Sequence, residues 1–219
     1  MKAILLAAGR GERMLEVRGK PLIVWHLEAL ARGGVREVVV NTAWLEDRIG
    51  EALGDGVRFG VSIRYSLEGR DHGGALETAG GLKKALPLLE LADAEPFWYV
   101  AADVYAPGFD FTAPAGLGDA FGLLHMVPNP PQHPTGDFGI AQGLATVGRD
   151  GERLTWSGIG LFRREFVTEL MVDLPLGEKA RLRPYLDAAI AQGRLAAVRY
   201  DGAWADVGTP GRLAALNAP

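Results

Sequence analysis

The sequence predicts an α/β protein built on a mainly parallel, mixed sheet with helices on both faces. Short apolar runs alternate four times with segments of helical periodicity in the first half of the chain. The connections between them are tight and glycine-rich, and the chain has 30 glycines in 219 residues. Alternating strands and helices are typical of right-handed βαβ units, which build parallel sheets.

The elements of the first half follow from their patterns of apolar residues. Continuous apolar or β-branched runs, or alternating patterns, predict strands at 2–8, 35–41, 61–66 and 97–103. Helical spacing predicts helices at 21–32, 43–54 and 75–89. Pro21 suits a first helical turn, and the Gly33–Gly34 pair ends that helix. We expect a Rossmann-like arrangement, in which ligands bind beyond the carboxyl ends of the strands.

The second half is less regular. Further strands are predicted at 121–127, 137–147, 154–162 and 195–200. Helices are predicted at 163–171 and 180–192 and near the carboxyl end, and the Pro-rich segment 129–136 is predicted to be a loop. Because no repeat or linker is visible, we expect one domain over residues 1–219, with halves at 1–104 and 105–219.

Composition excludes several classes of function. The net charge of -4 provides no overall basic field for nucleic acid, and the absence of cysteine excludes disulfides and thiolate sites. No apolar run approaches the ~20 residues of a membrane span, and the N-terminal run is typical of a core strand rather than a signal peptide. We therefore expect a cytoplasmic protein with no membrane or nucleic-acid partner.

The first predicted strand runs into "LLAAGRGERM", which has the features of a phosphate-binding loop. Ala7 and Ala8 leave room for a flat base, Gly9 and Gly11 let amide groups face phosphate oxygens, and Arg13 supplies a cationic fork. A dinucleotide fingerprint is disfavoured, because Met14 replaces its third glycine and Asn41 its strand-end acid. The ATPase loop with Gly-Lys-Ser/Thr is absent.

The loop resembles the signature of the sugar-nucleotidyltransferases, which join a nucleoside triphosphate to a sugar 1-phosphate and release pyrophosphate. The similarity continues through "GKPLIVWHLEALARGGVREVVVN", "ALETAGGLKKALPLL", "AADV", "TWSGIGLF" and "WADVGT". It is strongest to the bacterial N-acetylmuramate 1-phosphate uridylyltransferases, with the enzymes that make GDP-mannose or dTDP-glucose next. The resemblance implies a GT-A-like architecture, with a nucleotide-binding half at 1–104 and a sugar-binding or lid half at 105–219.

Two aspartates in these motifs are candidate ligands of Mg²⁺. Asp103 ends a buried strand, and Asp206 lies in "WADVGT". Nucleotidyl transfer brings two anions together, and magnesium, which prefers oxygen ligands, neutralises their charge. By resemblance, Asp103 and Asp206 are the metal ligands and, together with Arg13, the catalytic residues.

The resemblance also implies the remaining substrate contacts. Glu77 is expected to contact the base or the sugar, while Gly80 and Gly81 open a helix face to the nucleotide. Asp137 and Gly158 align with acceptor-sugar positions. The expected nucleotide-binding residues are therefore Ala7, Ala8, Gly9, Arg10, Gly11, Arg13, Glu77, Gly80 and Gly81, and the expected sugar-binding residues are Glu77, Asp137 and Gly158.

The chain departs from the family in one place. Relatives carry a Pro-Lys element after the loop arginine, whereas here "LEVRGKPL" follows Met14 directly, and Lys20 does not replace the missing lysine. Whether the protein lacks this segment or the sequence omits it stays open; we favour omission. A true deletion would favour a non-catalytic nucleotide-sugar sensor, and a nicotinamide-dependent dehydrogenase is a further alternative. The base and the sugar also stay open, and we expect a monomer or a weak dimer.

Overall fold

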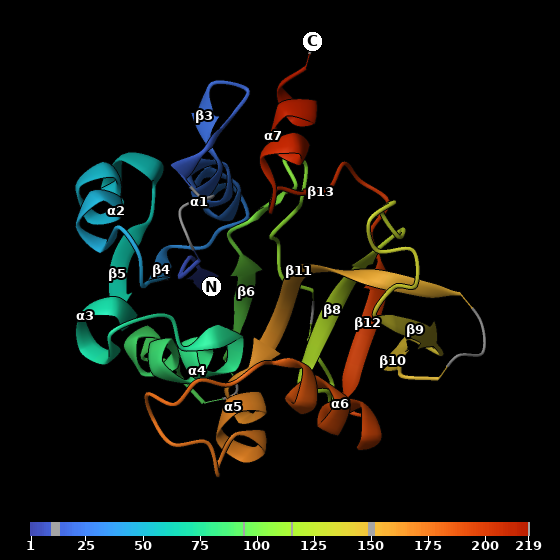
Figure 1. Cartoon of the computed structure of the whole chain (residues 1–219). Helices are drawn as coiled ribbons and strands as arrows, with labels where there is room; N and C mark the ends of the chain where they lie inside the picture. Colours follow the sequence, from blue (N-terminus) through green and yellow to red (C-terminus); the bar gives the residue numbers. More distant parts are fainter. Residues whose placement is uncertain (10–13, 94, 115, 149–151, 219) are drawn as a thin grey trace.

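A computed structural model of the chain describes residues 1–9, 14–93, 95–114, 116–148 and 152–218 (Figure 1). Within these ranges, nine strands form one sheet in the order β5-β4-β1-β6-β11-β8-β12-β10-β9. The strands are β1 (Lys2–Leu6), β4 (Glu37–Thr42), β5 (Ser62–Leu67), β6 (Pro96–Ala101), β8 (Gly122–Val127), β9 (Phe138–Ala141), β10 (Leu144–Thr146), β11 (Arg153–Arg163) and β12 (Leu195–Arg199). Both halves of the chain therefore contribute strands to the same sheet.

Helices cover both faces of this sheet (Figure 1). They are α1 (Leu22–Arg32), α2 (Glu46–Leu53), α3 (Glu68–His72), α4 (Glu77–Ala85), α5 (Arg164–Leu170), α6 (Arg183–Ala191) and α7 (Pro210–Asn217). Short 3-10 turns occupy Val57–Phe59 and Leu86–Leu89. Two small antiparallel pairs complete the fold: β2 (Glu16–Val17) with β3 (Lys20–Pro21), and β7 (Val104–Tyr105) with β13 (Ala205–Asp206).

The two faces of each central strand enter different apolar cores, because successive side chains of a strand point to opposite faces. On β1, Ile4 and Leu6 pack with buried residues of α4, α5 and α6, whereas Ala3 and Leu5 pack with those of α1 and α2. All four side chains are buried. Burial on both faces explains why β1 appears in the sequence as a continuous apolar run.

The predicted α/β organisation is present, with differences in the second half. Strands β5, β4, β1 and β6 are parallel, as expected for βαβ units, but β11 runs antiparallel to both β6 and β8. The sheet is therefore mixed: the strands of the first half are all parallel, whereas the second half combines antiparallel pairs with the parallel pair β8–β12. The strand expected at 137–147 is a hairpin, since Gln142 and Gly143 have φ of 51° and 77° and form a two-residue turn between β9 and β10.

The strand order explains where a ligand can enter. The chain moves from β1 outward to β4 and β5, and then returns to place β6 on the other side of β1. The connections that follow β1 and β6 therefore diverge, and such a switch point opens a crevice at the carboxyl ends of the strands. The buried His26 of α1 supports the segment after β6, because its Nε2 lies 2.7 Å from the carbonyl oxygen of Val104.

Burial lowers the pKa of His26 to about 4, so its ring is neutral at neutral pH and its Nε2–H donates to the Val104 carbonyl.

No helix in the described ranges combines the length and the apolar character needed to cross a bilayer.

Candidate active site

A cavity of about 630 Å³ opens at the carboxyl ends of β1 and β6. Segments far apart in the sequence form its walls: the end of β1, the start of α4, β6, β9, β11 and the start of α6. It brings together predicted residues from both halves of the chain, namely Ala8, Gly9, Glu77, Asp103, Asp137 and Gly158. The three predicted sugar-binding residues and part of the predicted nucleotide-binding set, Ala8, Gly9 and Glu77, thus share one cavity large enough for a nucleotide sugar.

The structure describes only the first part of the predicted phosphate loop. Arg10, Gly11 and Arg13 lie outside the described residues. Ala7 is buried and is not among the described residues that line the cavity. Its amide instead donates to the carboxamide oxygen of Asn41 at 2.5 Å, which holds the end of β1 against β4.

The two predicted metal ligands lie on neighbouring chain segments. The Val207 amide donates to the carbonyl of Asp103 at 2.9 Å, and Asp206 is paired with Val104 between β13 and β7. Asp103 lines the cavity, whereas Asp206 is not among the described lining residues. The Asp206 Oδ1 accepts from the Gly208 amide at 2.7 Å and from Arg212 at 3.1 Å, so its carboxylate is oriented.

This arrangement suits Mg²⁺. The ion takes oxygen ligands and is often held by one or two protein carboxylates together with phosphates and water. Two carboxylates on paired segments meet that need, and the described residues contain no cluster of three or more His, Cys, Asp or Glu that would indicate an all-protein metal cage.

A buried series of hydrogen bonds, which the sequence pattern does not predict, supports the part of the cavity between the end of β1 and the start of α4. The Asn41 amide nitrogen donates to Glu68 Oε1 at 2.5 Å, and Glu68 Oε2 accepts from the Leu76 amide at 2.8 Å. Glu68 is fully buried, and burial raises the pKa of its carboxyl. The chain Ala7–Asn41–Glu68–Leu76 therefore joins the end of β1 to the start of α4. Its sequence signal is Asn41, a polar residue that directly follows the three valines of β4.

Glu77, the first residue of α4, has a strained backbone. Its φ is 59°, in the left-handed region that residues other than glycine seldom adopt. The residue is exposed and lines the cavity. Strain of this kind concentrates at functional sites, which supports Glu77 as a binding residue.

Gly80 and Gly81 lie beneath the cavity instead of lining it. A Cβ atom at Gly80 would lie 2.3 Å from the carbonyl oxygen of Glu178, and one at Gly81 would lie 2.5 Å from Glu68 Oε1. Both residues are buried. Other residues of this chain therefore pack closely against the two glycines, in the place where the nucleotide was expected. The geometry gives no direct contact between these glycines and a nucleotide.

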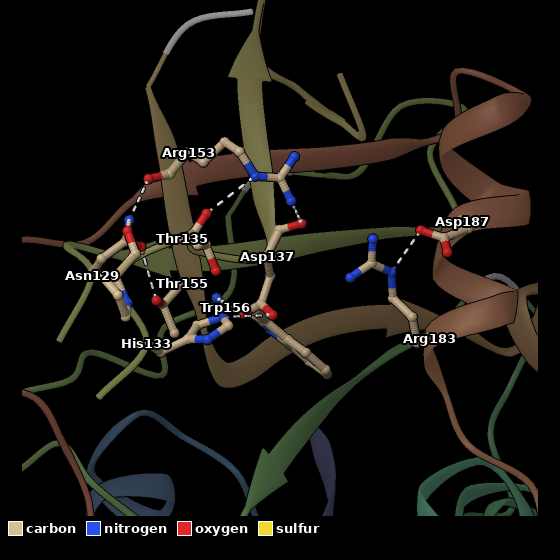
Figure 2. A network of polar contacts seen from close by, with 10 residues as sticks. Asn129, His133, Thr135, Asp137, Arg153, Thr155, Trp156, Arg183 and Asp187 are labelled. Atoms are coloured by element: carbon tan, nitrogen blue, oxygen red, sulfur yellow. Dashed lines mark hydrogen bonds and ion pairs between the residues drawn. The ribbon is translucent and has the colours of Figure 1, made fainter. Parts of the chain in front are cut away.

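Asp137 also lines the cavity, and a network of polar contacts holds it in place (Figure 2). Its Oδ2 accepts from the Trp156 amide at 2.8 Å, and its Oδ1 lies 3.1 Å from His133 Nε2. Arg153 donates to the Asp137 carbonyl at 2.5 Å. The carboxylate is thus positioned with acceptor capacity left for a sugar hydroxyl or amide.

Close by, Gly158 has a φ of 77°, and a Cβ added to it would lie 2.9 Å from the Cβ of Ala101. Glycine is required there by the backbone and by the packing of β11 on β6. Tyr99 also lines the cavity. Burial strongly raises the pKa of its hydroxyl, so the hydroxyl stays protonated and neutral.

Two positively charged residues, Arg181 and Arg183, also lie on the cavity wall, and no sequence motif indicates them. Lys20 is not among the described lining residues; its ammonium pairs with Glu28 at 2.6 Å and lies 4.2 Å from the centre of the Trp25 ring. It therefore does not take the place of the lysine that is missing after Met14.

Comparisons with known proteins agree with this geometry. A model of the nucleotidyl transferase family matches residues 2–114. An N-acetylmuramate alpha-1-phosphate uridylyltransferase of Neisseria meningitidis is 41% identical over 236 aligned positions, covering 100% of this chain and 97% of the relative. Another from Caulobacter vibrioides is 31% identical, covering 99% and 95%. The 236-position alignment is longer than the 219-residue chain, so the Neisseria relative has positions without a counterpart here.

Solved structures show the same fold. A Bacillus anthracis protein described as a glucose-1-phosphate thymidylyltransferase, in complex with sucrose, superposes with a TM-score of 0.75 at 17% identity, covering 99% of this chain and 94% of that one. HddC from Yersinia pseudotuberculosis superposes with a TM-score of 0.74 at 17% identity, covering 99% and 97%. The family match and the full-length relatives establish that the chain belongs to the nucleotidyl transferase family, as a sugar-1-phosphate nucleotidyltransferase.

Proposed function

We propose that this enzyme transfers the uridylyl group of UTP to N-acetylmuramate 1-phosphate, giving UDP-N-acetylmuramate and pyrophosphate with Mg²⁺ as cofactor. The observation that carries the proposal is one cavity lined by Gly9 after β1, by Asp103 and by Asp137. The full-length similarity to uridylyltransferases of this name supports the choice of base and sugar. The product would be a cell-wall precursor, and the reaction would belong to peptidoglycan recycling.

Different residues in and beside the cavity would bind the triphosphate, the metal ion and the sugar. Backbone amides at the loop that begins with Ala8 and Gly9 would hold the triphosphate, since amides in a glycine-rich turn bind anions. Asp103 and Asp206 would hold Mg²⁺, which neutralises phosphate charge when bound. Asp137 would accept hydrogen bonds from the sugar and so hold its 1-phosphate in line with the α-phosphorus.

No general base is needed from the protein. The attacking 1-phosphate already carries negative charge near neutral pH, so no proton has to be removed from it. What the chain must supply is alignment of the two phosphates and relief of their repulsion, which are the main contributions in phosphoryl-type transfer.

A non-catalytic nucleotide-sugar sensor is the second candidate. The observation that favours it is the segment missing after Met14, with Lys20 engaged by Glu28 instead of facing the cavity. A sensor would bind nucleotide and release no pyrophosphate.

The test measures pyrophosphate release with Mg²⁺ across UTP, dTTP, GTP, CTP and ATP, each with N-acetylmuramate, N-acetylglucosamine, glucose and mannose 1-phosphates. The expected pair is UTP with N-acetylmuramate 1-phosphate. Asp103→Asn and Asp206→Asn should each lower kcat about 100-fold or more, the size of losing one preorganised electrostatic contact. Asp173→Asn, at an exposed carboxylate away from the cavity, should leave kcat unchanged.

The other outcomes are informative. Guanylyl or thymidylyl transfer, with mannose or glucose 1-phosphate, would keep the mechanism and replace the substrates. Nucleotide binding without turnover of any pair would favour the sensor.

A further inference from the structure

The acceptor in the proposed function carries a charge that its close analogue lacks. N-acetylmuramate is N-acetylglucosamine with a lactyl ether at the 3-position, and that ether ends in a carboxylate. If the enzyme has the proposed function, it must therefore offer a cation to this group, at the sugar end of the cavity. The residue that supplies that cation can be sought among the charged groups of the cavity wall.

Charged side chains of both signs line the cavity. Its described lining includes three acidic residues, Glu77, Asp103 and Asp137, and two cations, Arg181 and Arg183. Arg183 is the first residue of α6 and Arg181 lies two residues before it. Helix α6 packs on β10 and β12, whereas the phosphate loop follows β1 on the other side of β6 and β11. The arginines are therefore placed for an anion of the sugar and away from the loop expected to hold the triphosphate.

Arg183 is held in a defined orientation. Its Nε donates to Asp187 one turn along α6 at 2.8 Å, and its guanidinium carbon lies 4.5 Å above the centre of the Phe138 ring on β9. Figure 2 shows Nε directed at Asp187 and one of the two terminal nitrogens pointing away from it, toward the side of Asp137. Within the described part of the chain these nitrogens have no hydrogen-bond partner.

Such a guanidinium group is prepared for a carboxylate. Two parallel N–H groups match the two oxygens of a carboxylate, and stacking plus the bond at Nε reduce the entropy lost on binding. Arg181 adds positive potential on the same wall. Its position follows from Ala180, whose amide donates to the Leu76 carbonyl at 3.1 Å and whose carbonyl accepts from the Ala79 amide at 2.8 Å.

We propose that Arg183 binds the lactyl carboxylate through its two terminal nitrogens and thereby selects the muramyl acceptor over N-acetylglucosamine 1-phosphate; this rests on the proposed function. Asp137, which directly precedes β9, takes hydroxyl or amide groups that both sugars share, so it contributes affinity without this selectivity. Arg181 and Arg183 are the cations among the described residues that line the cavity, so this wall is the place for the lactyl carboxylate.

The experiment compares kcat/KM for N-acetylmuramate 1-phosphate and N-acetylglucosamine 1-phosphate, with UTP, in the wild type and in Arg183→Met. The ratio of the two values is expected to fall about 30-fold, the effect of losing one hydrogen-bonded charge pair. Arg183→Lys should recover part of the ratio, since it keeps the charge without the fork. Calorimetric Kd values for UDP-N-acetylmuramate and UDP-N-acetylglucosamine give the same ratio without turnover.

A matched control is available in Arg194. It also lies over a phenylalanine, with its guanidinium carbon 3.5 Å from the centre of the Phe121 ring, and it pairs with Glu169, but it is not among the described residues that line the cavity. Arg194→Met should leave the substrate ratio unchanged, so a change found only at position 183 is not a general effect of removing a stacked arginine.

Two results would overturn the inference alone. Either an unchanged ratio in Arg183→Met, or an equal loss with both sugars, would show that Arg183 serves no group or a group that the sugars share. A wild type that neither turns over the muramyl sugar nor binds its UDP derivative would overturn the proposed function itself, and the inference with it.

Discussion

Replacing Glu68 with alanine should strongly destabilise the protein, because this carboxylate holds two buried donors. The side chain is fully buried and accepts from the Asn41 amide nitrogen at 2.5 Å and from the Leu76 amide at 2.8 Å. Glu68→Ala leaves both donors buried without an acceptor. Gly81 packs close to the same carboxylate, since a Cβ atom added to it would lie 2.5 Å from Glu68 Oε1.

The magnitude follows from the number of groups left unsatisfied. Each buried donor that loses its partner costs about 1–3 kcal/mol, so the two together lower the free energy of unfolding by about 4 kcal/mol. For a chain of this length that corresponds to a fall in Tm of about 10 °C. Glu68→Gln keeps one acceptor and turns its NH₂ toward the other donor, so it should lose about half as much.

Urea unfolding followed by circular dichroism at pH 7 measures these differences. Glu51→Ala is the matched control: the carboxylate is exposed on α2, and its removal should change the free energy of unfolding by less than about 0.5 kcal/mol. Amide hydrogen exchange gives a local readout, since the amides of Ala7 and Leu76 should lose protection in Glu68→Ala. A loss below about 1 kcal/mol, with both amides still protected, would refute the view that this polar chain holds β1 to α4.

The remaining predictions concern acid sensitivity and one glycine. Burial lowers the pKa of His26 and His125 from 6.5 to about 4, so the unfolded chain binds protons that the folded chain does not. Stability is therefore complete above about pH 6.5 and should fall by about 2 kcal/mol per histidine on going from pH 7 to pH 5, which urea unfolding at the two pH values measures; no fall would contradict the two pKa values. Gly158→Ala should lower the free energy of unfolding by about 3 kcal/mol, since it combines a φ of 77° with a Cβ 2.9 Å from Ala101, and activity should fall as well. Gly143→Ala, with the same φ of 77° and no atom within 4 Å, should show only the conformational part; equal losses at the two glycines in thermal unfolding would exclude the packing contribution.

Much of the first half can be predicted because its signals are local. β1 and β6 are buried on both faces, so each is an uninterrupted apolar run, and the residues at their ends are the ones that face a ligand. Gly9 and Asp103 are predicted for that reason, and both line the cavity. The hairpin of β9 and β10 has the sequence pattern of one strand, because its turn at Gln142–Gly143 interrupts the pattern by only two residues.

Contacts between distant segments leave no comparable signal. Asp206 lies beside Asp103 only because β13 pairs with β7, and nothing local to "WADVGT" predicts that pairing; family resemblance alone indicates the residue. The burial of Glu68 cannot be predicted from the sequence for a related reason. A glutamate beside glycine and arginine has the pattern of a solvated turn, and only the three-dimensional packing of α3 against β4 buries it.

Arg183 shows why specificity is harder to predict than chemistry. Arg183 and Asp187 are four residues apart in a helix, and such pairs are ordinary features of exposed helix surfaces. The structure distinguishes this pair from an ordinary surface pair. Phe138 of β9 lies beneath the Arg183 guanidinium, and both Arg183 and Asp137 line the cavity. The residues proposed for nucleotidyl transfer, such as Asp103, follow the ends of strands, where the fold itself places them. The groups that distinguish one sugar from another depend on how the second half of the chain folds over that site, so their role becomes visible only when the walls of the cavity are known.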